Sequence, residues 1–433
     1  MRRQSPDRAT LDLLHQVLVA GKTFYFLAAL AAVMFGLYVY TFYIQFTQGH
    51  GVTGQSTPVG AVWGLYVASL VFFIGISHVG IGISAATRLL NLHYLRPYTR
   101  MAEVLTLVCL VAAVLIIVVD IGRPERFLIN VLRYGRIQAP FVWSATVISV
   151  YLVASVIYLY LSMRRDIALS ADLVPRWGWF YKLLALGYED TEEQRRLHER
   201  TLWWLALVLI PIMVTVHSVY GLIFGLHAAR AGWFNPFMAP YFVLGALVNG
   251  FATLVIVATL IRKLFGWQQY LPIQAIRNMG RFLCWMTLLY IYFSLAEYLT
   301  YIYSPLSGEA TVARSLFLGD FSRIFWPTMA ALLIGYLMLF FNQTVFRHQF
   351  TLWVTVVGAI LINGVLFATR YLIVVPSLMR PALPFPTGTY APTLYEWAAL
   401  IGVFGFALGA YAVFMKLFPI IELPHSSELE TTE

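Results

Sequence analysis

Ten long apolar runs, separated by short polar segments, organise this chain. A helix needs about 20 predominantly apolar residues to cross the hydrocarbon core of a membrane. Runs of that length lie near 23–46, 61–89, 101–120, 140–163, 201–227, 240–265, 281–303, 324–341, 350–374 and 393–417, each bounded by charged residues, Pro or Gly. The pattern predicts an all-α, polytopic membrane protein of about ten transmembrane helices.

Composition supports this prediction. Of the 433 residues, 60% are hydrophobic and 11% are charged, whereas soluble domains hold roughly 45–50% apolar and about 25% charged residues. The formal net charge of +9 does not indicate a nucleic-acid-binding surface, because the basic residues lie in short loops and not on one face. We therefore expect the chain to contact the lipid bilayer and to have no nucleic-acid partner.

The distribution of Lys and Arg predicts the orientation. With the N-terminus in the cytoplasm, 20 of the 29 Lys and Arg residues lie on the cytoplasmic side, as the positive-inside bias favours. Both termini are then cytoplasmic in a multi-pass protein. Segment 121–139 opposes the bias with four arginines on the outer side. Either they serve a functional site or docking surface, or a protein of many spans simply tolerates them.

Three polar segments have expected conformations. Residues 1–22 are amphipathic and too short to span, which favours a cytoplasmic interfacial helix. Segment 164–200 is expected to form a surface helix with Trp177 and Trp179 at the headgroup level. The proline-rich segment 371–392 is expected to lie over the outer face without helical structure.

Two cysteines, Cys109 and Cys284, both lie inside apolar runs. The sequence contains no CxxC or CxxCH motif, so it lacks the usual cysteine ligands of an iron–sulfur cluster or a c-type haem. We expect no haem or iron–sulfur cluster in this chain, and two small core residues instead.

Ionisable groups inside a membrane are costly, so each is a candidate functional group. His78 lies near the middle of the second run, and Glu103 begins the third on the cytoplasmic side. Most others lie towards the outer side, at the level of Trp63 and Tyr66: Asp120, His217, His227, Glu297 and Glu396. A carboxylate, an imidazole and a tyrosine there could hydrogen-bond the two oxygens of a quinone ring and accept its protons on oxidation.

Each candidate also has a structural alternative. His78 could bond a backbone carbonyl of a neighbouring helix, and Glu103 could form an interfacial ion pair with Arg100. Trp63 and Tyr66 could belong to the aromatic belt at the membrane surface. One b-type haem between His78 and His217 is a further alternative, because such a haem needs two axial ligands at matching depth on facing helices.

Several stretches resemble the NrfD/PsrC family, the quinone-interacting membrane subunits of polysulfide-reductase-like complexes. They are Trp63 through His78 to Arg88, the segment Arg100–Met101–Ala102–Glu103, and the segment Asp120–Ile121–Gly122–Arg123–Pro124–Glu125–Arg126–Phe127. The last, at the outer end of an apolar helix, is the most specific. A later segment, Ala296–Glu297–Tyr298–Leu299–Thr300–Tyr301, is similar to the long ten-helix members, such as those of alternative complex III.

The resemblance implies two four-helix bundles plus flanking helices. We expect the following division: 1–22, cytoplasmic interfacial segment; 23–60, first transmembrane helix and outer loop; 61–227, first four-helix bundle; 228–375, second four-helix bundle; 376–433, outer proline-rich loop, last transmembrane helix and cytoplasmic tail.

The resemblance also implies a site for a quinone, menaquinone or ubiquinone, in the first bundle near the outer face. Asp120 and Arg123 fall on the family motif, and we expect Asp120 to accept a proton and Arg123 to orient it. His217 as second catalytic group and Tyr66 with Trp63 as pocket residues are assigned by depth alone. Residues expected to transfer protons are His78, Glu103 and Glu297.

The expected location and partners follow from the family. The resemblance implies a prokaryotic inner (plasma) membrane. A periplasmic-side iron–sulfur protein would dock on the outer face, with a molybdopterin-type subunit or multihaem cytochrome beyond it, and a paralogous membrane subunit is a further candidate. The leading hypothesis is a quinone/quinol-interacting subunit of a respiratory or photosynthetic oxidoreductase complex, without its own redox cofactor. The alternative is a structural or proton-translocating subunit without a quinone site. A stand-alone secondary transporter is disfavoured, because no paired broken helices are visible.

Overall fold

The computed structural model describes residues 10, 11, 13, 14, 17, 20–55, 61–174, 177–304, 306–380 and 389–423. In this part of the chain, 10 helices are long and apolar enough to cross a membrane. They are α2 (Lys22–Gln48), α3 (Leu65–Leu89), α4 (Arg96–Ile121), α6 (Pro140–Leu173), α8 (Glu192–Gly225), α9 (Met238–Leu264), α10 (Ile273–Tyr303), α12 (Ser322–Gln343), α13 (Leu352–Leu378) and α14 (Leu394–Leu417). The prediction of an all-α protein with ten spans is confirmed.

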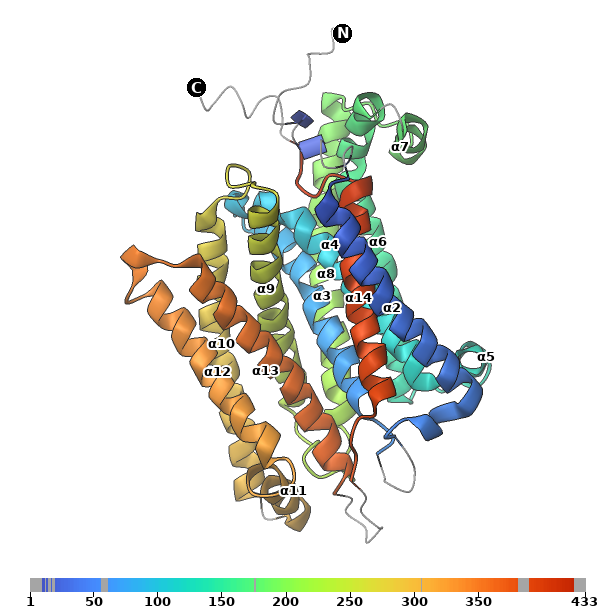
Figure 1. The fold of residues 1–433 in the computed structure, drawn as a ribbon, viewed down its shortest axis with the longest axis vertical. Helices are drawn as coiled ribbons and strands as arrows, with labels where there is room; N and C mark the ends of the chain where they lie inside the picture. Colours follow the sequence, from blue (N-terminus) through green and yellow to red (C-terminus); the bar gives the residue numbers. More distant parts are fainter. Residues whose placement is uncertain are drawn as a thin grey trace.

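Short helices lie at both ends of the molecule (Figure 1). Two of them, α5 (Pro124–Tyr134) and α11 (Ser307–Phe317), lie at the lower end, and α7 (Gly178–Ala185) lies at the upper end. Single 3-10 turns also occur: η1 (Gly49–Val52), η2 (His93–Leu95) and η4 (Arg347–Gln349). We call the lower end the motif end, because segment 120–127 lies there, and the upper end the α7 end.

Helices α6 and α8 project beyond the others at the α7 end (Figure 1). Each has 34 residues, about 51 Å at 1.5 Å per residue, against a hydrocarbon core of about 30 Å. The surface helix expected in 164–200 is therefore mostly replaced by these extensions. Only α7, which holds Trp179 and begins directly after Trp177, lies separately. The interfacial helix expected over 1–22 falls largely outside the described residues.

The proline-rich segment begins later than expected. Helix α13 continues through Pro376 to Leu378, four residues beyond the predicted end of that run. Proline has a helical φ, so Pro376 continues the helix with the loss of one intrahelical hydrogen bond. Residues 381–388 lie outside the described part of the chain.

The spans pack in two groups. Helices α3, α4, α6 and α8 contact one another, as do α9, α10, α12 and α13, and α3 also packs against α9 and α13. This arrangement agrees with two four-helix bundles that share α3 as their central element. Almost every residue of α3 is buried, so this helix lies inside the protein.

The first and last spans, α2 and α14, lie side by side and flank the first bundle (Figure 1). Their backbones approach closely because α14 presents glycines: a Cβ on Gly402 would lie 2.5 Å from the backbone nitrogen of Tyr38, and one on Gly405 would lie 2.9 Å from that of Phe35. Small residues commonly allow such close helix packing in membranes. Since α14 also packs against α4, this pair brings further side chains to the end of α4.

Candidate functional site

Five polar residues from separate segments gather at the motif end. Gln45 lies in the last turn of α2, Tyr66 and Glu396 lie in the first turns of α3 and α14, Asp120 is the penultimate residue of α4, and Gln55 follows η1. The helices run antiparallel, so two that end and two that begin there meet at one level. We call these five residues the motif-end polar group.

Asp120 is the most accessible acid of the group, being only half-buried. The side-chain amide of Gln55 donates to Asp120 Oδ1 at 3.1 Å, and Glu396 lies close enough for the two charges to interact. Tyr66 is fully buried, and its hydroxyl accepts a hydrogen bond of 2.5 Å from Gln45 Nε2. A carboxylate, a phenol and two amides are thus held at one level, with Asp120 the group that is partly exposed.

Glu396 holds the surrounding backbone together. Its Oε2 accepts from the backbone nitrogens of Gly54 and Thr393, both at 2.8 Å, and its Oε1 accepts from the hydroxyl of Tyr390 at 2.5 Å. The Tyr390 oxygen in turn accepts from the backbone nitrogen of Leu65 at 2.8 Å. This carboxylate, 0% exposed, therefore joins the segment before Gln55 to the start of α3.

Two features keep Tyr390 in this role. Burial, and then the negative charge of Glu396, raise the pKa of Tyr390, so that its hydroxyl stays protonated and able to donate. Glycines allow its close packing: a Cβ on Gly64 would overlap the Tyr390 ring, and one on Gly54 would lie 3.0 Å from its Cε2. The sequence analysis did not identify Gln45, Gln55 or Tyr390.

The residue pattern of segment 120–127 has a direct structural meaning. Gly122 ends α4 in the left-handed region, with φ +69°, which glycine adopts without steric cost. Arg123 is the N-cap of α5, and Pro124 is its first residue, a position where proline's fixed φ suits a helix. The motif thus stops one helix immediately after Asp120 and starts another along the surface.

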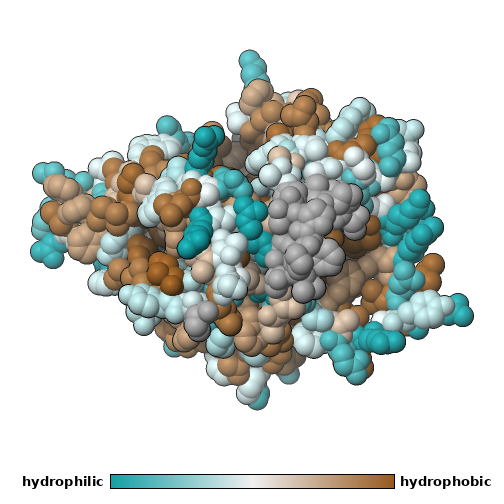
Figure 2. Space-filling view, turned by 90° about the horizontal axis from the view of Figure 1, so that it is seen from below, coloured by the Kyte–Doolittle hydropathy of each residue, from teal (hydrophilic) through white to brown (hydrophobic). Residues whose placement is uncertain are grey.

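An open groove of about 680 Å³ follows the motif, between the end of α4, α5 and the start of α6. Arg123, Arg126 and Phe127 line it together with Phe141. Figure 2 looks onto the motif end and shows hydrophilic side chains next to hydrophobic ones over this face. Arg123 is exposed, and within the described residues no hydrogen bond or ion pair joins it to Asp120; its predicted orienting role stays a prediction.

The two histidines of the first bundle form a second group. The rings of His78 and His217 lie 4.5 Å apart, edge to face. His78 Nδ1 contacts the carbonyl of Ile74 at 2.8 Å and Nε2 that of Met213 at 2.9 Å, so the structural alternative considered for His78 is observed. A neutral imidazole carries one N–H, so His78 donates to one of these two carbonyls at a time. His217 is 0% exposed, and neither of its ring nitrogens has a partner among the described residues.

Asp120 and His217 lie at different depths. Asp120 is one residue from the end of α4, whereas His217 is eight residues from the end of α8, about 10 Å deeper at 1.5 Å per residue. No hydrogen bond or ring contact between them occurs in the part of the chain that the structure describes. That both serve one quinone ring therefore stays a prediction.

An aromatic cluster lies between the motif end and His217. Trp63 stacks on Trp233 at 5.9 Å and lies 6.1 Å from Phe224, and Phe224 lies 5.7 Å from Phe242. The Phe242 ring is 6.2 Å from His217. The guanidinium of Arg370 lies 4.1 Å above the Phe242 ring. Arg370 is 3% exposed, and the sequence analysis did not identify it as a candidate.

Glu103 and Glu297, expected to transfer protons, are each held by neutral donors. Glu103 accepts from Ser84 at 2.7 Å and Ser162 at 2.5 Å, while Arg100 pairs with Asp166 instead; the alternative of an ion pair between Arg100 and Glu103 is not observed. In the second bundle, Glu297 accepts from Asn235 and Tyr301. Both glutamates are nearly fully buried.

Comparison with known proteins identifies the family. The family described as "Polysulphide reductase, NrfD" matches residues 51–382. The chain belongs to the NrfD family. This membership confirms the resemblance inferred from segment 120–127. The matched region of this NrfD protein begins after α2 and ends before α14, so Gln45 and Glu396 come from the flanking pair outside it.

This NrfD protein is similar to membrane subunits of several reductases. A protein of Halobacterium salinarum, named as a putative membrane subunit of dimethyl sulfoxide reductase, is 28% identical over 265 residues, covering 61% of this chain and 58% of that protein. A selenate reductase subunit of Mesobacillus selenatarsenatis is 23% identical, covering 88% and 91%. A menaquinone reductase integral membrane subunit of Nitratidesulfovibrio vulgaris is 24% identical, covering 93% and 92%.

Proposed function

We propose that this NrfD-family chain is the quinone/quinol-interacting membrane subunit of a multisubunit oxidoreductase. The motif-end polar group is the observation that carries the proposal, because a half-buried carboxylate, Asp120, lies there with an amide donor and a buried tyrosine. The relative named as a menaquinone reductase subunit supports a quinone as the substrate, with menaquinone as the first to test.

The chemistry assigned to these residues is proton transfer. Oxidation of a quinol to a quinone releases two protons and two electrons. Asp120, held by Gln55, accepts one proton, and Tyr66 hydrogen-bonds a ring oxygen. The groove beside α5 suits the apolar tail, since Phe127 and Phe141 line it, and its volume lies in the range of about 300–1,000 Å³ typical of ligand pockets.

His217 is the proposed second proton acceptor, acting below the ring through a water molecule or a second substrate position. A buried polar group without a partner costs about 1–3 kcal/mol, so its two unpartnered nitrogens imply a group that completes them. Trp63 and the aromatic cluster separate this position from the motif end, and we assign Trp63 to the lining of this path.

The electrons leave through a partner subunit. The relatives named as subunits of dimethyl sulfoxide and selenate reductases support a partner that carries redox centres: an iron–sulfur protein, a molybdopterin-type subunit or a multihaem cytochrome. We assign the motif end to the periplasmic side, because 20 of the 29 Lys and Arg residues belong to the other side. The partner then docks over α5, where the arginines of 121–139 gather.

Substitution of the two proposed proton acceptors tests the function. In the purified complex, Asp120→Asn is expected to slow quinol oxidation at least about 100-fold, the lower range for loss of a general base, and His217→Ala to slow it as well. Matched controls are Glu193→Gln, an exposed acid in the first turn of α8, and His348→Ala, an exposed histidine; both lie at the α7 end, away from the proposed site and docking surface. Unchanged quinol oxidation in both site variants would refute the proposal.

The alternative function is a structural or proton-translocating subunit without its own quinone site. Glu103, His78 and Glu297 favour it, because each is a buried group with hydrogen-bonding side chains or carbonyls around it. Binding of a quinone analogue to the complex distinguishes the two: binding that Asp120→Asn abolishes supports the quinone site. Proton uptake by proteoliposomes that Glu297→Gln abolishes, with no analogue bound, supports the alternative.

A further inference from the structure

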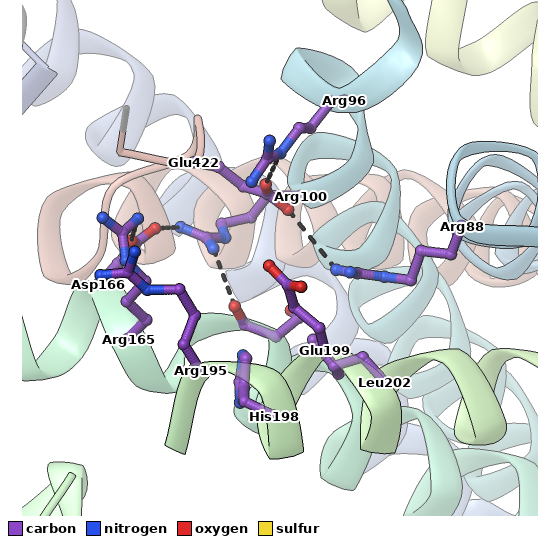
Figure 3. A pocket seen from close by; sticks show the side chains of 11 residues that line it. Arg88, Arg96, Arg100, Arg165, Asp166, Arg195, His198, Glu199, Leu202 and Glu422 are labelled. Atoms are coloured by element: carbon purple, nitrogen blue, oxygen red, sulfur yellow. Dashed lines mark hydrogen bonds and ion pairs between the residues drawn. The ribbon is translucent and has the colours of Figure 1, made fainter. Parts of the chain in front are cut away.

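Five arginines line one small pocket (Figure 3). It lies at the α7 end, at the opposite end of the first bundle from the motif-end polar group. Arg88 comes from α3, Arg96 and Arg100 from α4, Arg165 from α6 and Arg195 from α8. The cavity has a volume of about 50 Å³, room for a few water molecules at roughly 10–15 Å³ each, or for one tetrahedral oxyanion. None of these residues has a part in the proposed quinone site.

Carboxylates pair with most of these arginines. Asp166, Glu199 and Glu422 line the pocket, and Asp190, just outside the lining, lies 3.0 Å from Arg195 and 3.5 Å from Arg165. Arg100 is 1% exposed and pairs with Asp166, yet its Nε has no partner in the described part of the chain. A buried donor without a partner is costly, so an anion whose oxygen accepts from Arg100 Nε would be stabilised here.

One carboxylate already shows how the pocket holds an anion. Glu422, on the segment after α14, lies 2.8 Å from Arg96 Nε and 3.8 Å from Arg88 Nη2. Burial opposes its charged form, but the guanidinium groups around it, Arg88 foremost, hold the pKa of Glu422 below its usual value. Figure 3 shows this side chain reaching between Arg96 and Arg88.

The same segment is fixed by its backbone. The carbonyl of Leu423 accepts from Arg165 at 3.0 Å, and its nitrogen donates to Asp166 at 3.2 Å, while Arg100 also donates to the carbonyl of Pro419 at 3.3 Å. The arginines therefore bind one carboxylate and two carbonyl oxygens of segment 419–423. Oxygen acceptors brought by a ligand would meet the same donors.

We propose that this pocket binds a phosphate group, either the headgroup phosphate of an anionic phospholipid or a free phosphate. The planar fork of arginine matches phosphate oxygens in pairs, and the cavity admits one such group. Arg88 lies in the last turn of α3, and Arg96 begins α4, which puts both at the depth of lipid headgroups. Basic pockets between transmembrane helices bind acidic headgroups in this way.

Substitutions in the purified complex test the proposal. One is expected to weaken phosphate binding, one to strengthen it, and one serves as a control. Arg96 and Arg195 lie at the rim, with side chains 34% and 33% exposed, so Arg96→Gln with Arg195→Gln leaves the buried pair of Arg100 intact. Each arginine removed is expected to weaken binding about five-fold, and the pair about 30-fold. Glu422→Gln removes the competing charge and is expected to strengthen binding several-fold. Arg281→Gln, an exposed arginine of α10, is the control.

Two probes separate the sources of the phosphate. The first is nanodiscs of phosphatidylcholine with or without phosphatidylglycerol, with native mass spectrometry counting the phospholipids retained; the second is inorganic phosphate, titrated by calorimetry into the delipidated complex. Retained phosphatidylglycerol that inorganic phosphate does not displace identifies a lipid site, and calorimetric binding of phosphate alone identifies a soluble anion. Binding of neither probe would overturn the proposal, as would Glu422→Gln weakening binding or the Arg281→Gln control losing it equally.

Discussion

Replacing Glu396 by glutamine tests whether this carboxylate organises the motif end. Three donors converge on it: the backbone nitrogens of Gly54 and Thr393 on Oε2 and the Tyr390 hydroxyl on Oε1. Glutamine has the same shape but only one acceptor oxygen. If that oxygen keeps the two backbone donors, the amide nitrogen faces Tyr390, whose oxygen already accepts from Leu65, and the tyrosine proton loses its acceptor.

The magnitude follows from the hydrogen bonds lost. A hydrogen bond to a charged group contributes about 1.5–3 kcal/mol and a neutral one about 1 kcal/mol. Loss of the Tyr390 bond therefore costs about 2 kcal/mol, and weakening of the two backbone bonds about 1 kcal/mol or more. We expect Glu396→Gln to destabilise the motif end by about 3 kcal/mol and to release the segment that presents Gln55 to Asp120.

Two assays measure these consequences in the purified complex. Thermal unfolding followed by intrinsic fluorescence should show a fall of several degrees in Tm. Quinol oxidation should fall because Asp120 loses its donor, with Glu396 acting as a positioning residue and not on the ring itself. Glu309→Gln is the matched control, because Glu309 accepts one backbone bond, from Gly232 at 2.9 Å, and a much smaller change is expected. An unchanged Tm and unchanged quinol oxidation in Glu396→Gln would refute this reasoning.

Two further substitutions address packing and buried charge. Gly64→Ala should lower quinol oxidation and Tm in the same assays as Glu396→Gln, since its methyl group would displace the Tyr390 ring; wild-type behaviour would mean that Tyr390 moves without consequence. Asp166→Asn should destabilise the protein by about 3–5 kcal/mol, because it leaves the buried Arg100 without its counter-charge. Arg100→Met combined with Asp166→Leu should be less destabilising than either single change, measured by Tm in a double-mutant cycle.

The spans could be predicted closely from the sequence because a physical length defines them. The run ends at the motif end, for example 120, 140 and 303, agree with the helix ends within four residues. The helix ends at the α7 end were less predictable. There α6 and α8 extend beyond their apolar runs into polar segments, where hydrophobicity no longer marks a helix. The 120–127 motif could be recognised because its residues are adjacent in the sequence. Its Gly and Pro set the backbone conformation at their own positions, where one helix ends and the next begins.

The partners of the site residues could not be predicted, because they lie far away in the sequence. Gln55 lies 65 positions from Asp120, and Tyr390 lies 325 positions from Leu65. Neither is an ionisable group in an apolar run, which was the signal used. Arg100 shows the opposite error: Glu103 is close in sequence, but the guanidinium pairs with Asp166, 66 positions away, because Glu103 is already satisfied by two serines.

The flanking helices lie outside the part of the chain that matches the family, yet they supply two of the five residues of the motif-end polar group. Packing between α2 and α14 should therefore control the site from a distance. A methyl group on Gly405 would meet Met34 and lie 2.9 Å from the backbone nitrogen of Phe35, so Gly405→Ala forces α14 away from α2. Since Glu396 lies on α14 and Gln45 on α2, quinol oxidation should fall.

Gly36→Ala provides the matched control on the same helix pair. A methyl group on Gly36 would meet nothing within 4 Å, and alanine favours a helix over glycine by about 1 kcal/mol, so this change should leave Tm and quinol oxidation unaltered or slightly raise Tm. Gly405→Ala should lower both, although it makes the same chemical change one helix away. Equal behaviour of the two variants would show that contact between the flanking helices does not position the carboxylate, and that α3 and α4 alone determine the site.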